Sequence, residues 1–123
     1  MIGTTYSVNP PSYVSCDSGI SAEITGITLP AGTYIISAGL SWSDTVRGGG
    51  RRIHIRQGDY YNSPVIADDA TDDFLNDAAP MEQSATGIVV LSTGSNIKLW
   101  ATQTSGSNLS VESTAFLKAV RIK

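Results

Sequence analysis

Residues 30–42, Pro-Ala-Gly-Thr-Tyr-Ile-Ile-Ser-Ala-Gly-Leu-Ser-Trp, contain the clearest strand signal in the chain. Apolar or aromatic side chains occupy every even position from Tyr34 to Trp42, whereas small residues, serine and glycine, occupy the odd positions from Ser37 onward. Because side chains alternate between the two faces of a strand, this pattern predicts one buried face and one small, polar face. The Pro-Ala-Gly turn starts the strand, since proline fixes φ and glycine relieves the bend. We expect a strand from Gly32 to Trp42.

The same period-two alternation recurs along the chain between turns rich in glycine, proline, asparagine and serine. Seven further segments follow it: 13–16, 21–27, 51–56, 86–91, 95–102, 108–112 and 114–122. Helix patterns are nearly absent. The sequence therefore predicts an all-β, antiparallel jelly-roll sandwich of about eight to ten strands. We assign the head domain to residues 13–123 and treat residues 1–12 as an N-terminal arm or attachment segment.

Length and charge exclude several classes of function. A chain of 123 residues fits one domain with its own core. A net charge of −3 without a long run of lysine and arginine argues against a nucleic-acid partner. No apolar run approaches the ~18 residues of a membrane helix, and no leader follows Met1, so we expect no membrane insertion. The single cysteine, Cys16, cannot close an intrachain disulfide, and we interpret it as a buried structural thiol.

The last predicted strand, 114–122, is apolar on both faces. One face carries Phe116, Val120 and Ile122, and the other carries Ala115, Leu117 and Ala119. A strand that is apolar on both faces is buried on both. Since a small sandwich has little of its own chain to cover a second face, we expect a subunit interface lined by Leu117, Ala119 and Ala115. Crowding within the core of a monomer is the alternative.

Residues 67–82 are expected to form a long acidic loop, because the strand pattern is weak there. The acidic residues are Asp68, Asp69, Asp72, Asp73, Asp77 and Glu82. Calcium prefers such oxygen ligands, which makes Asp68, Asp69, Asp72 and Asp73 calcium candidates, although the spacing of an EF-hand loop is missing. Two alternatives stay open. The loop is simply solvated, or its carboxylates pair with the arginines between Arg51 and Arg56 of a neighbouring subunit.

The residues and motifs of the sequence do not indicate an enzymatic reaction. His54 is the only histidine, and no nucleophile-elbow motif is present. A pair of Cys16 and His54 has no support from sequence spacing. His54 stands between Arg52 and Arg56 on the polar side of its strand, and we interpret it as a surface or interface residue. We expect no enzymatic activity, no cofactor and no further metal site.

Two adjacent tyrosines, Tyr60 and Tyr61, occupy a predicted hairpin turn together with Asn62. Adjacent strand residues point in opposite directions, so at least one ring faces outward. Tyrosine beside aspartate and asparagine on a loop is suited to stacking on a sugar or to a protein contact. Tyr60, Tyr61 and Asn62, with Asp68 and Asp69, are therefore our candidate ligand contacts. Packing of both rings on the sheet edge is the alternative.

Residues 27–34 (ITLPAGTY), continued by Ile36, Ala38 and Trp42, resemble the L-P-x-G-x-Y start of the central strand in complement-like globular heads, members of the tumour-necrosis-factor-like jelly-roll superfamily. Further segments keep the order of that family. Residues 50–55 (GRRIHI) resemble the strand that follows a glycine-rich turn in phage tail modules. Residues 91–99 (LSTGSNIKL) resemble the L-x-x-G-D-x-I-x-L hairpin, and residues 103–109 (QTSGSNL) resemble the Q-x-S-G-x-x-L segment. Residues 116–120 (FLKAV) resemble the closing strand. Asn96 stands where the hairpin usually has aspartate, and no collagen-like or coiled stalk precedes the head.

This resemblance spans about residues 13–122 and implies a compact homotrimer with the last strand near its threefold axis. It also implies a bacteriophage structural protein on the virion surface, in a tail fibre, a baseplate or the capsid exterior. Our first hypothesis is a trimeric module that attaches to a host glycan or envelope protein. The second is a capsid decoration or head-fibre protein that binds and stabilises other virion proteins. A secreted complement-like ligand is a third class. The resemblance transfers no ligand-binding residues.

Overall fold

The structure, a computed structural model, describes residues 2–42, 50–71 and 81–123. Within these ranges the chain forms ten strands and no helix. The strands are β1 (Thr5–Val8), β2 (Val14–Cys16), β3 (Ala22–Leu29), β4 (Gly32–Trp42), β5 (Arg51–Gln57), β6 (Val65–Thr71), β7 (Met81–Leu91), β8 (Ser95–Gln103), β9 (Leu109–Val111) and β10 (Phe116–Arg121). No membrane-spanning helix is therefore present in the described ranges. The all-β prediction is confirmed.

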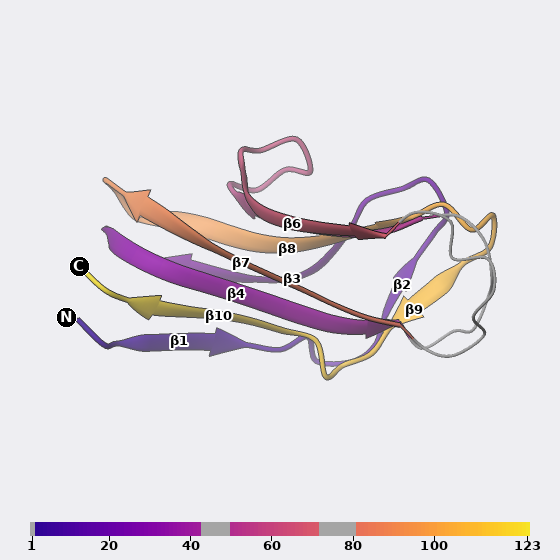
Figure 1. The fold of residues 1–123 in the computed structure, drawn as a ribbon, viewed down its shortest axis with the longest axis horizontal. Helices are drawn as coiled ribbons and strands as arrows, with labels where there is room; N and C mark the ends of the chain where they lie inside the picture. The colour runs from indigo at the N-terminus through magenta and orange to yellow at the C-terminus, as the bar shows by residue number, and fades with distance from the viewer. Residues whose placement is uncertain (1, 43–49, 72–80) are drawn as a thin grey trace.

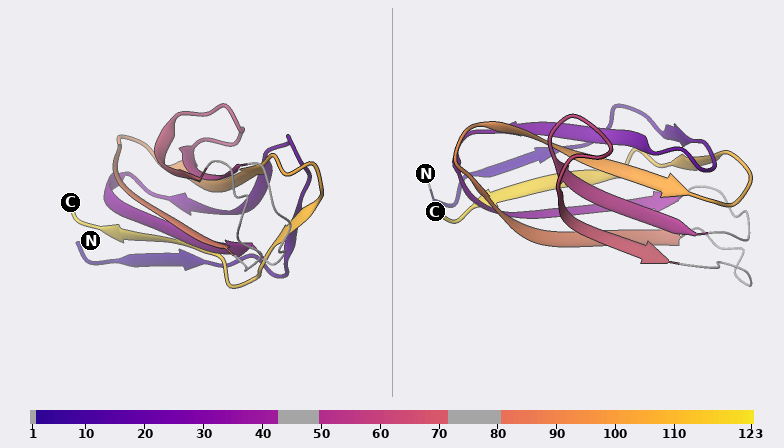
Figure 2. Two further views of the ribbon diagram at one scale, coloured as in Figure 1. Left: turned by 45° about the vertical axis from the view of Figure 1, so that its right-hand side comes forward. Right: turned by 90° about the horizontal axis from the view of Figure 1, so that it is seen from above.

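The strands form two antiparallel sheets that face each other (Figure 1). The first sheet has β1, β10, β4 and β7 side by side, and β9 and β2 continue from β4. The second has the order β3-β8-β5-β6. β4 has the bounds expected from the sequence and pairs with β7 over its whole length, from Gly32 opposite Leu91 to Trp42 opposite Met81. Figure 2 shows the same strands from two further directions.

The hydrophobic core lies between the two sheets. The even positions of β4 from Tyr34 to Trp42 are all buried there, as their alternation predicts. The facing sheet contributes fully buried side chains from β5 and β8, among them Ile53, Ile55, Ile97 and Leu99. Burial of each such side chain stabilises the fold by roughly 1.5–3 kcal/mol before chain entropy is counted. Tyr34 satisfies its hydroxyl by donating to the carbonyl of Pro30 at 2.8 Å.

Two strands lie where the sequence was expected to form none. β1 falls within residues 1–12 and pairs with β10 from Thr5 opposite Val120 to Val8 opposite Leu117. A role of this segment in attachment stays a prediction. β6 and the first half of β7 replace both ends of the expected acidic loop, so Asp68 and Glu82 lie on strands. β6 tolerates its acidic residues because it is an edge strand, paired only with β5, and part of its side chains face solvent.

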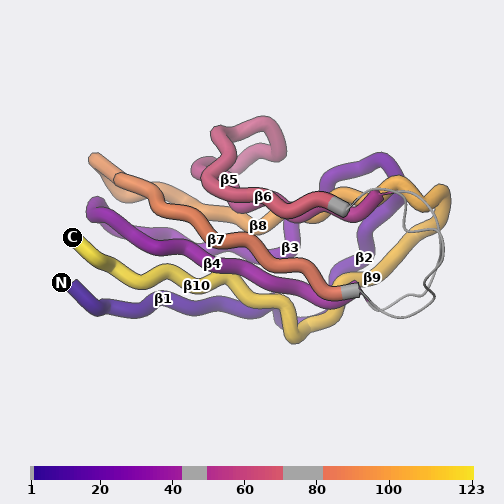
Figure 3. Tube along the Cα trace, viewed as in Figure 1, coloured from indigo at the N-terminus to yellow at the C-terminus, as the bar shows by residue number. Residues whose placement is uncertain are grey.

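Both ends of the described chain lie together at one end of the sandwich (Figure 3). The amide of Gly3 donates to the carbonyl of Arg121 at 2.7 Å, and the amide of Arg121 donates to Thr4 at 2.9 Å. β4 ends and β7 begins at the opposite end of the sheet, where Trp42 pairs with Met81. We call the end of the first sheet at which the chain termini lie its terminal end, and the end with Trp42 and Met81 its opposite end.

Candidate functional site

The outer face of the first sheet carries exposed apolar side chains near its terminal end. They are Ile35, Ile88, Val90 and Ile122, and together with the half-buried Val120 we call them the apolar patch. Ile35 pairs with Ile88 on one side and with Val120 on the other, so three strands contribute to one row. Val90 is 72% exposed and Ile88 64%. Such a contiguous apolar group on a sheet surface is typical of a protein contact.

The three residues predicted to line a subunit interface lie elsewhere. Leu117, Ala119 and Ala115 are fully buried in the core of their own chain. A second copy cannot touch them, so this residue assignment is corrected. The two-sided apolarity of β10 is real, but the face left outward is that of Phe116 and Val120. Alternation alone does not say which of two apolar faces meets the facing sheet.

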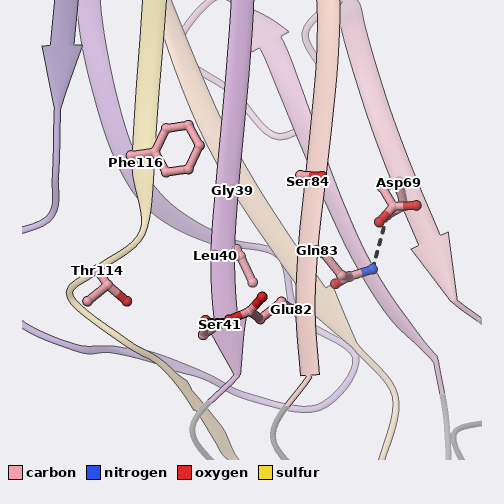
Figure 4. A pocket seen from close by; sticks show the side chains of 9 residues that line it. All are labelled: Gly39, Leu40, Ser41, Asp69, Glu82, Gln83, Ser84, Thr114 and Phe116. Atoms are coloured by element: carbon pink, nitrogen blue, oxygen red, sulfur yellow. Dashed lines mark hydrogen bonds between the residues drawn. The ribbon is translucent and has the colours of Figure 1, made fainter.

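A hollow of about 530 Å³ lies at the opposite end of the same sheet face (Figure 4). Its lining comes from four strands and the turn before β10: Gly39, Leu40, Ser41, Asp69, Glu82, Gln83, Ser84, Thr114 and Phe116. In Figure 4 Phe116 and Thr114 lie on one side of β4, and Glu82, Ser84 and Asp69 lie on the other. We call this site the acidic hollow, because its ionisable side chains, Asp69 and Glu82, are both acidic.

Phe116 is held in place by the absence of a side chain at Gly39. An ideal Cβ at Gly39 would lie 2.7 Å from Cε1 of the ring and 3.1 Å from Cζ. The ring therefore lies against the backbone of β4, with the residue 38% exposed at the edge of the hollow. This contact could not be predicted from the sequence, because positions 39 and 116 meet only through the pairing of β4 with β10.

Gln83 joins the floor of the hollow to the core. Its side-chain amide donates to the carbonyl of Arg51 at 3.0 Å and to that of Asp69 at 3.4 Å. Its carbonyl accepts from the indole of Trp42 at 2.8 Å. One buried side chain thus links β7 of the first sheet to β5 and β6 of the second. This arrangement fixes the position of β6, and with it Asp69, relative to the hollow.

The tyrosine turn between β5 and β6 is exposed. Of the two alternatives that the sequence left open, outward-facing rings or rings packed on the sheet edge, the structure shows the first. Tyr60 is 71% exposed and Tyr61 61%. Ser63 orders the turn, because its hydroxyl accepts from the amide of Tyr60 at 3.1 Å and its own amide donates to the carbonyl of Tyr60 at 3.0 Å. Tyr61 lines a second hollow, of about 280 Å³, with Ile20 of the preceding β2–β3 turn.

The acidic candidates do not form one site with the tyrosines. Asp68 accepts a hydrogen bond from Arg52 of the same chain at 2.7 Å, so this carboxylate has an intrachain partner. Asp69 faces the acidic hollow instead. Asp72 and Asp73 lie outside the described residues. Within the described ranges, no group of three or more His, Cys, Asp and Glu residues could hold a metal ion.

His54 is buried, which corrects its assignment to the surface. It is 4% exposed on the outer side of β5, opposite Asp68 on β6 and Trp100 on β8. Arg56 covers it and donates to Nδ1 from Nε at 3.1 Å. Burial lowers the pKa of His54 to about 4, helped by the charges of Arg56 and Arg52 and opposed by Asp68. The imidazole is therefore neutral near pH 7.

Cys16 and His54 do not meet. The Cys16 thiol is fully buried in the core, where it contacts the carbonyl of Ala101 at 3.6 Å, whereas His54 lies on the outer side of the second sheet. Burial, helped by the charge of Asp17, raises the pKa of the thiol to about 11. A protonated, inaccessible thiol is a poor nucleophile. The reading of Cys16 as a buried thiol is confirmed.

Comparison with solved structures identifies the fold. VP2 of infectious bursal disease virus, solved as a subviral particle, matches 96% of this chain with a TM-score of 0.66 and 13% sequence identity, and the match covers 33% of VP2. The Eiger TNF of S. frugiperda matches 99% of this chain and is itself covered over 92%, with a TM-score of 0.62 and 12% identity. The chain is a jelly roll. It spans about a third of the VP2 chains that it matches.

The jelly roll of this chain resembles the tumour-necrosis-factor-like fold, as its sequence predicts. A third similar structure is an enzyme, the Stig cyclase Fisc from Fischerella sp. TAU, with a TM-score of 0.51, 16% identity and coverage of 84% of this chain and 56% of the cyclase. No protein-family model matches the sequence, and no curated protein matches it. Similarity at this level of identity shows the fold alone, so the function has to be argued from the surfaces of the jelly roll.

Proposed function

We propose that the chain is a non-enzymatic structural protein of the virion exterior that assembles as a homotrimer. The apolar patch carries this proposal. An exposed apolar row on a sheet face is stabilised when a second copy covers it, because burial removes roughly 25 cal/mol of unfavourable hydration per Å². The similarity to a particle-forming viral protein and to a tumour-necrosis-factor-like protein supports the same role. The bacteriophage setting rests on the family resemblance of the sequence.

The trimer is tested by substitutions that place a charge in the patch. The intact chain is expected to sediment at three times its monomer mass, and Val90→Asp at the monomer mass with an unchanged circular dichroism spectrum. Val65→Asp is the matched control, because Val65 is an exposed valine on an edge strand of the other sheet, 45% exposed. A monomeric intact chain, or equal behaviour of the two variants, contradicts the proposal.

The virion location is tested on particles. Antibodies raised against the purified chain are expected to label the outside of intact virus particles that encode it. Absence of the chain from purified particles contradicts the structural role.

Attachment to a host receptor, a glycan or an envelope protein, is the proposed task of the tyrosine turn. The exposure of Tyr60 and Tyr61 supports it, together with the neighbouring exposed Asn62. Tyr60→Ala and Tyr61→Ala are expected to lower binding of the chain to intact host cells. Tyr13→Ala is the control, since Tyr13 is an equally exposed tyrosine, 67%, outside this turn. Cell binding that none of the turn variants changes contradicts the proposal.

Capsid decoration or a head-fibre role, with other virion proteins as partners, is the second candidate. The hollow that joins Tyr61 to Ile20 supports it, because an aromatic ring beside an exposed isoleucine fits an apolar protein surface. Ile20→Asp is then expected to weaken binding to capsids that lack the chain and to leave host-cell binding intact. The reverse result favours the receptor role.

A further inference from the structure

We propose that the acidic hollow binds a neutral saccharide. The hollow has about 530 Å³, which is within the roughly 300–1,000 Å³ of small-molecule sites. It combines an aromatic ring, two carboxylates and several hydroxyls, and none of these features is part of the apolar patch or the tyrosine turn.

Phe116 supplies the apolar wall of the site. Its ring cannot settle toward the sheet any further, because Gly39 already lets it touch the backbone of β4. A flat ring fixed in this way is a platform for the apolar C–H face of a sugar, and little entropy is lost when a ligand stacks on it.

The opposite wall supplies hydrogen bonds. Glu82 is exposed, and its contact with a protein side chain is a long one, 3.5 Å from the hydroxyl of Ser41. Within the described residues, the hydroxyl of Ser84 on this wall makes no side-chain hydrogen bond, and neither does the hydroxyl of Thr114 on the side of Phe116. Carboxylates accept charge-assisted hydrogen bonds from the hydroxyls of a sugar, and serine and threonine can both donate and accept. The free capacity of this wall therefore matches a polyhydroxylated ligand.

Charge decides between classes of ligand. Asp69 and Glu82 have no lysine or arginine beside them among the described residues that line the hollow. Two carboxylates without a described basic neighbour in the hollow repel sialic acid, uronic acids and phosphate, so an acidic sugar is disfavoured. A metal ion is not favoured either, because in the described ranges no cluster of three or more potential ligands occurs. A neutral saccharide satisfies the hydroxyls and the ring together, whereas a lysine or arginine of a partner protein would use mainly the carboxylates.

The hollow stays accessible in the proposed trimer. Ile35 of the apolar patch and Ser41 of the hollow are six residues apart on β4, or roughly 20 Å along the strand. A second copy on the apolar patch can leave the opposite end of the sheet open. A part of this site in receptor attachment, in addition to that of the tyrosine turn, rests on the proposed function, whereas the binding of a saccharide does not.

The test uses the full chain and methyl glycosides of glucose, galactose, mannose and N-acetylglucosamine, with N-acetylneuraminic acid as the acidic probe. Saturation-transfer NMR is expected to detect at least one neutral glycoside and not the acidic probe. Phe116→Ala and Glu82→Gln are expected to weaken binding about tenfold each, which corresponds to about 1.4 kcal/mol. Phe116→Trp is expected to retain binding, since it keeps an aromatic ring.

Two controls separate this site from its surroundings. Glu23→Gln removes an exposed carboxylate from the other sheet, and Tyr13→Ala removes an exposed ring that belongs neither to the hollow nor to the tyrosine turn. Neither is expected to change glycoside binding. Glu82 points outward, so Glu82→Gln is expected to unfold at the temperature of the unchanged chain. Phe116→Ala loses the packing of its ring on β4 and is expected to unfold at a lower temperature but to stay folded where binding is measured. Thermal denaturation checks both variants.

Several outcomes overturn the inference. They are the absence of binding by every neutral glycoside at millimolar concentration, binding that Phe116→Ala and Glu82→Gln leave unchanged, and binding of an arginine-containing peptide in place of the glycosides. A trimeric chain that binds no glycoside overturns this inference and leaves the assembly proposal intact. A monomeric chain that binds a glycoside in the hollow overturns the assembly proposal and leaves this inference intact.

Discussion

Arg56 places its guanidinium on Nδ1 of His54, with Nη2 at 2.8 Å from that nitrogen. An arginine can only donate, so Nδ1 accepts and the imidazole proton resides on Nε2. Within the described chain, Nε2 has no hydrogen-bond partner, and neither has the indole nitrogen of the neighbouring Trp100. The only histidine of the chain is thus held neutral under two arginines, Arg52 and Arg56.

Stability is expected to fall as the pH falls from about 6.5 to 4. The pKa of His54 is about 4 in the folded state, below its ordinary value of 6.5, so the unfolded chain binds the proton first. The free energy of unfolding falls by about 1.4 kcal/mol per pH unit over this window, and it levels off at lower pH. The free energy of unfolding, measured with urea at pH 7.5 and at pH 5, is expected to differ by roughly 2 kcal/mol because of His54.

His54→Gln isolates the histidine contribution, because glutamine can still accept from Arg56 and does not titrate. Its unfolding free energy is expected to change less between the two pH values than that of the unchanged chain. Equal pH dependence of both proteins would show that His54 keeps an ordinary pKa.

Leu117→Ala is expected to destabilise the fold itself by about 3 kcal/mol, since it leaves a cavity among fully buried residues. Lys118→Ala, at the adjacent exposed position, is expected to stay within about 0.5 kcal/mol. Denaturant unfolding measures both. A Leu117→Ala protein that dissociates into monomers but unfolds at the same denaturant concentration as the unchanged chain would show that Leu117 lies in the interface after all.

Gly87→Ala is expected to cost roughly 1–3 kcal/mol, because a Cβ there would lie 2.9 Å from the backbone carbonyl of Ile66 on β6. A backbone atom cannot turn aside as a side chain can. Gly94→Ala is the control, since its Cβ would make an ordinary contact of 3.4 Å. Comparable unfolding midpoints for the two variants would mean that β6 can move away from β7.

Gln83→Leu is expected to lower the unfolding free energy by about 2 kcal/mol. The substitution leaves the buried indole of Trp42 and the carbonyl of Arg51 without the amide that serves both. Ser84→Ala, on the exposed side of the same strand, serves as the reference. Calorimetric unfolding compares the pair, and a stable Gln83→Leu protein would indicate that water replaces the amide.

Patterns within one strand were predictable, whereas contacts between strands were not. The alternation from Tyr34 to Trp42 fixed β4 because hydrophobic periodicity is local. β6 escaped prediction, since an edge strand can carry Asp68 and Asp69 without losing its backbone pairing. Its strand character depends on β5, which no local pattern encodes.

Burial was misjudged where a long side chain covers a shorter one. His54 stands between arginines in sequence, which suggested solvent exposure. In the fold, the guanidinium of Arg56 turns back onto Nδ1 of the ring, and His54 is buried. The acidic hollow was out of reach for a related reason. Gly39, Glu82 and Phe116 are far apart in the chain, and only the registers of β7 and β10 with β4 bring them together.

The pairing of Gly3 with Arg121 gives the molecule a polarity. Any polypeptide grafted to either terminus leaves from the same pole, beside the apolar patch. The pole that carries Phe116 and Glu82 then points away from the tether. Such a domain can be anchored through both of its ends at once and still display its far pole to whatever approaches from outside.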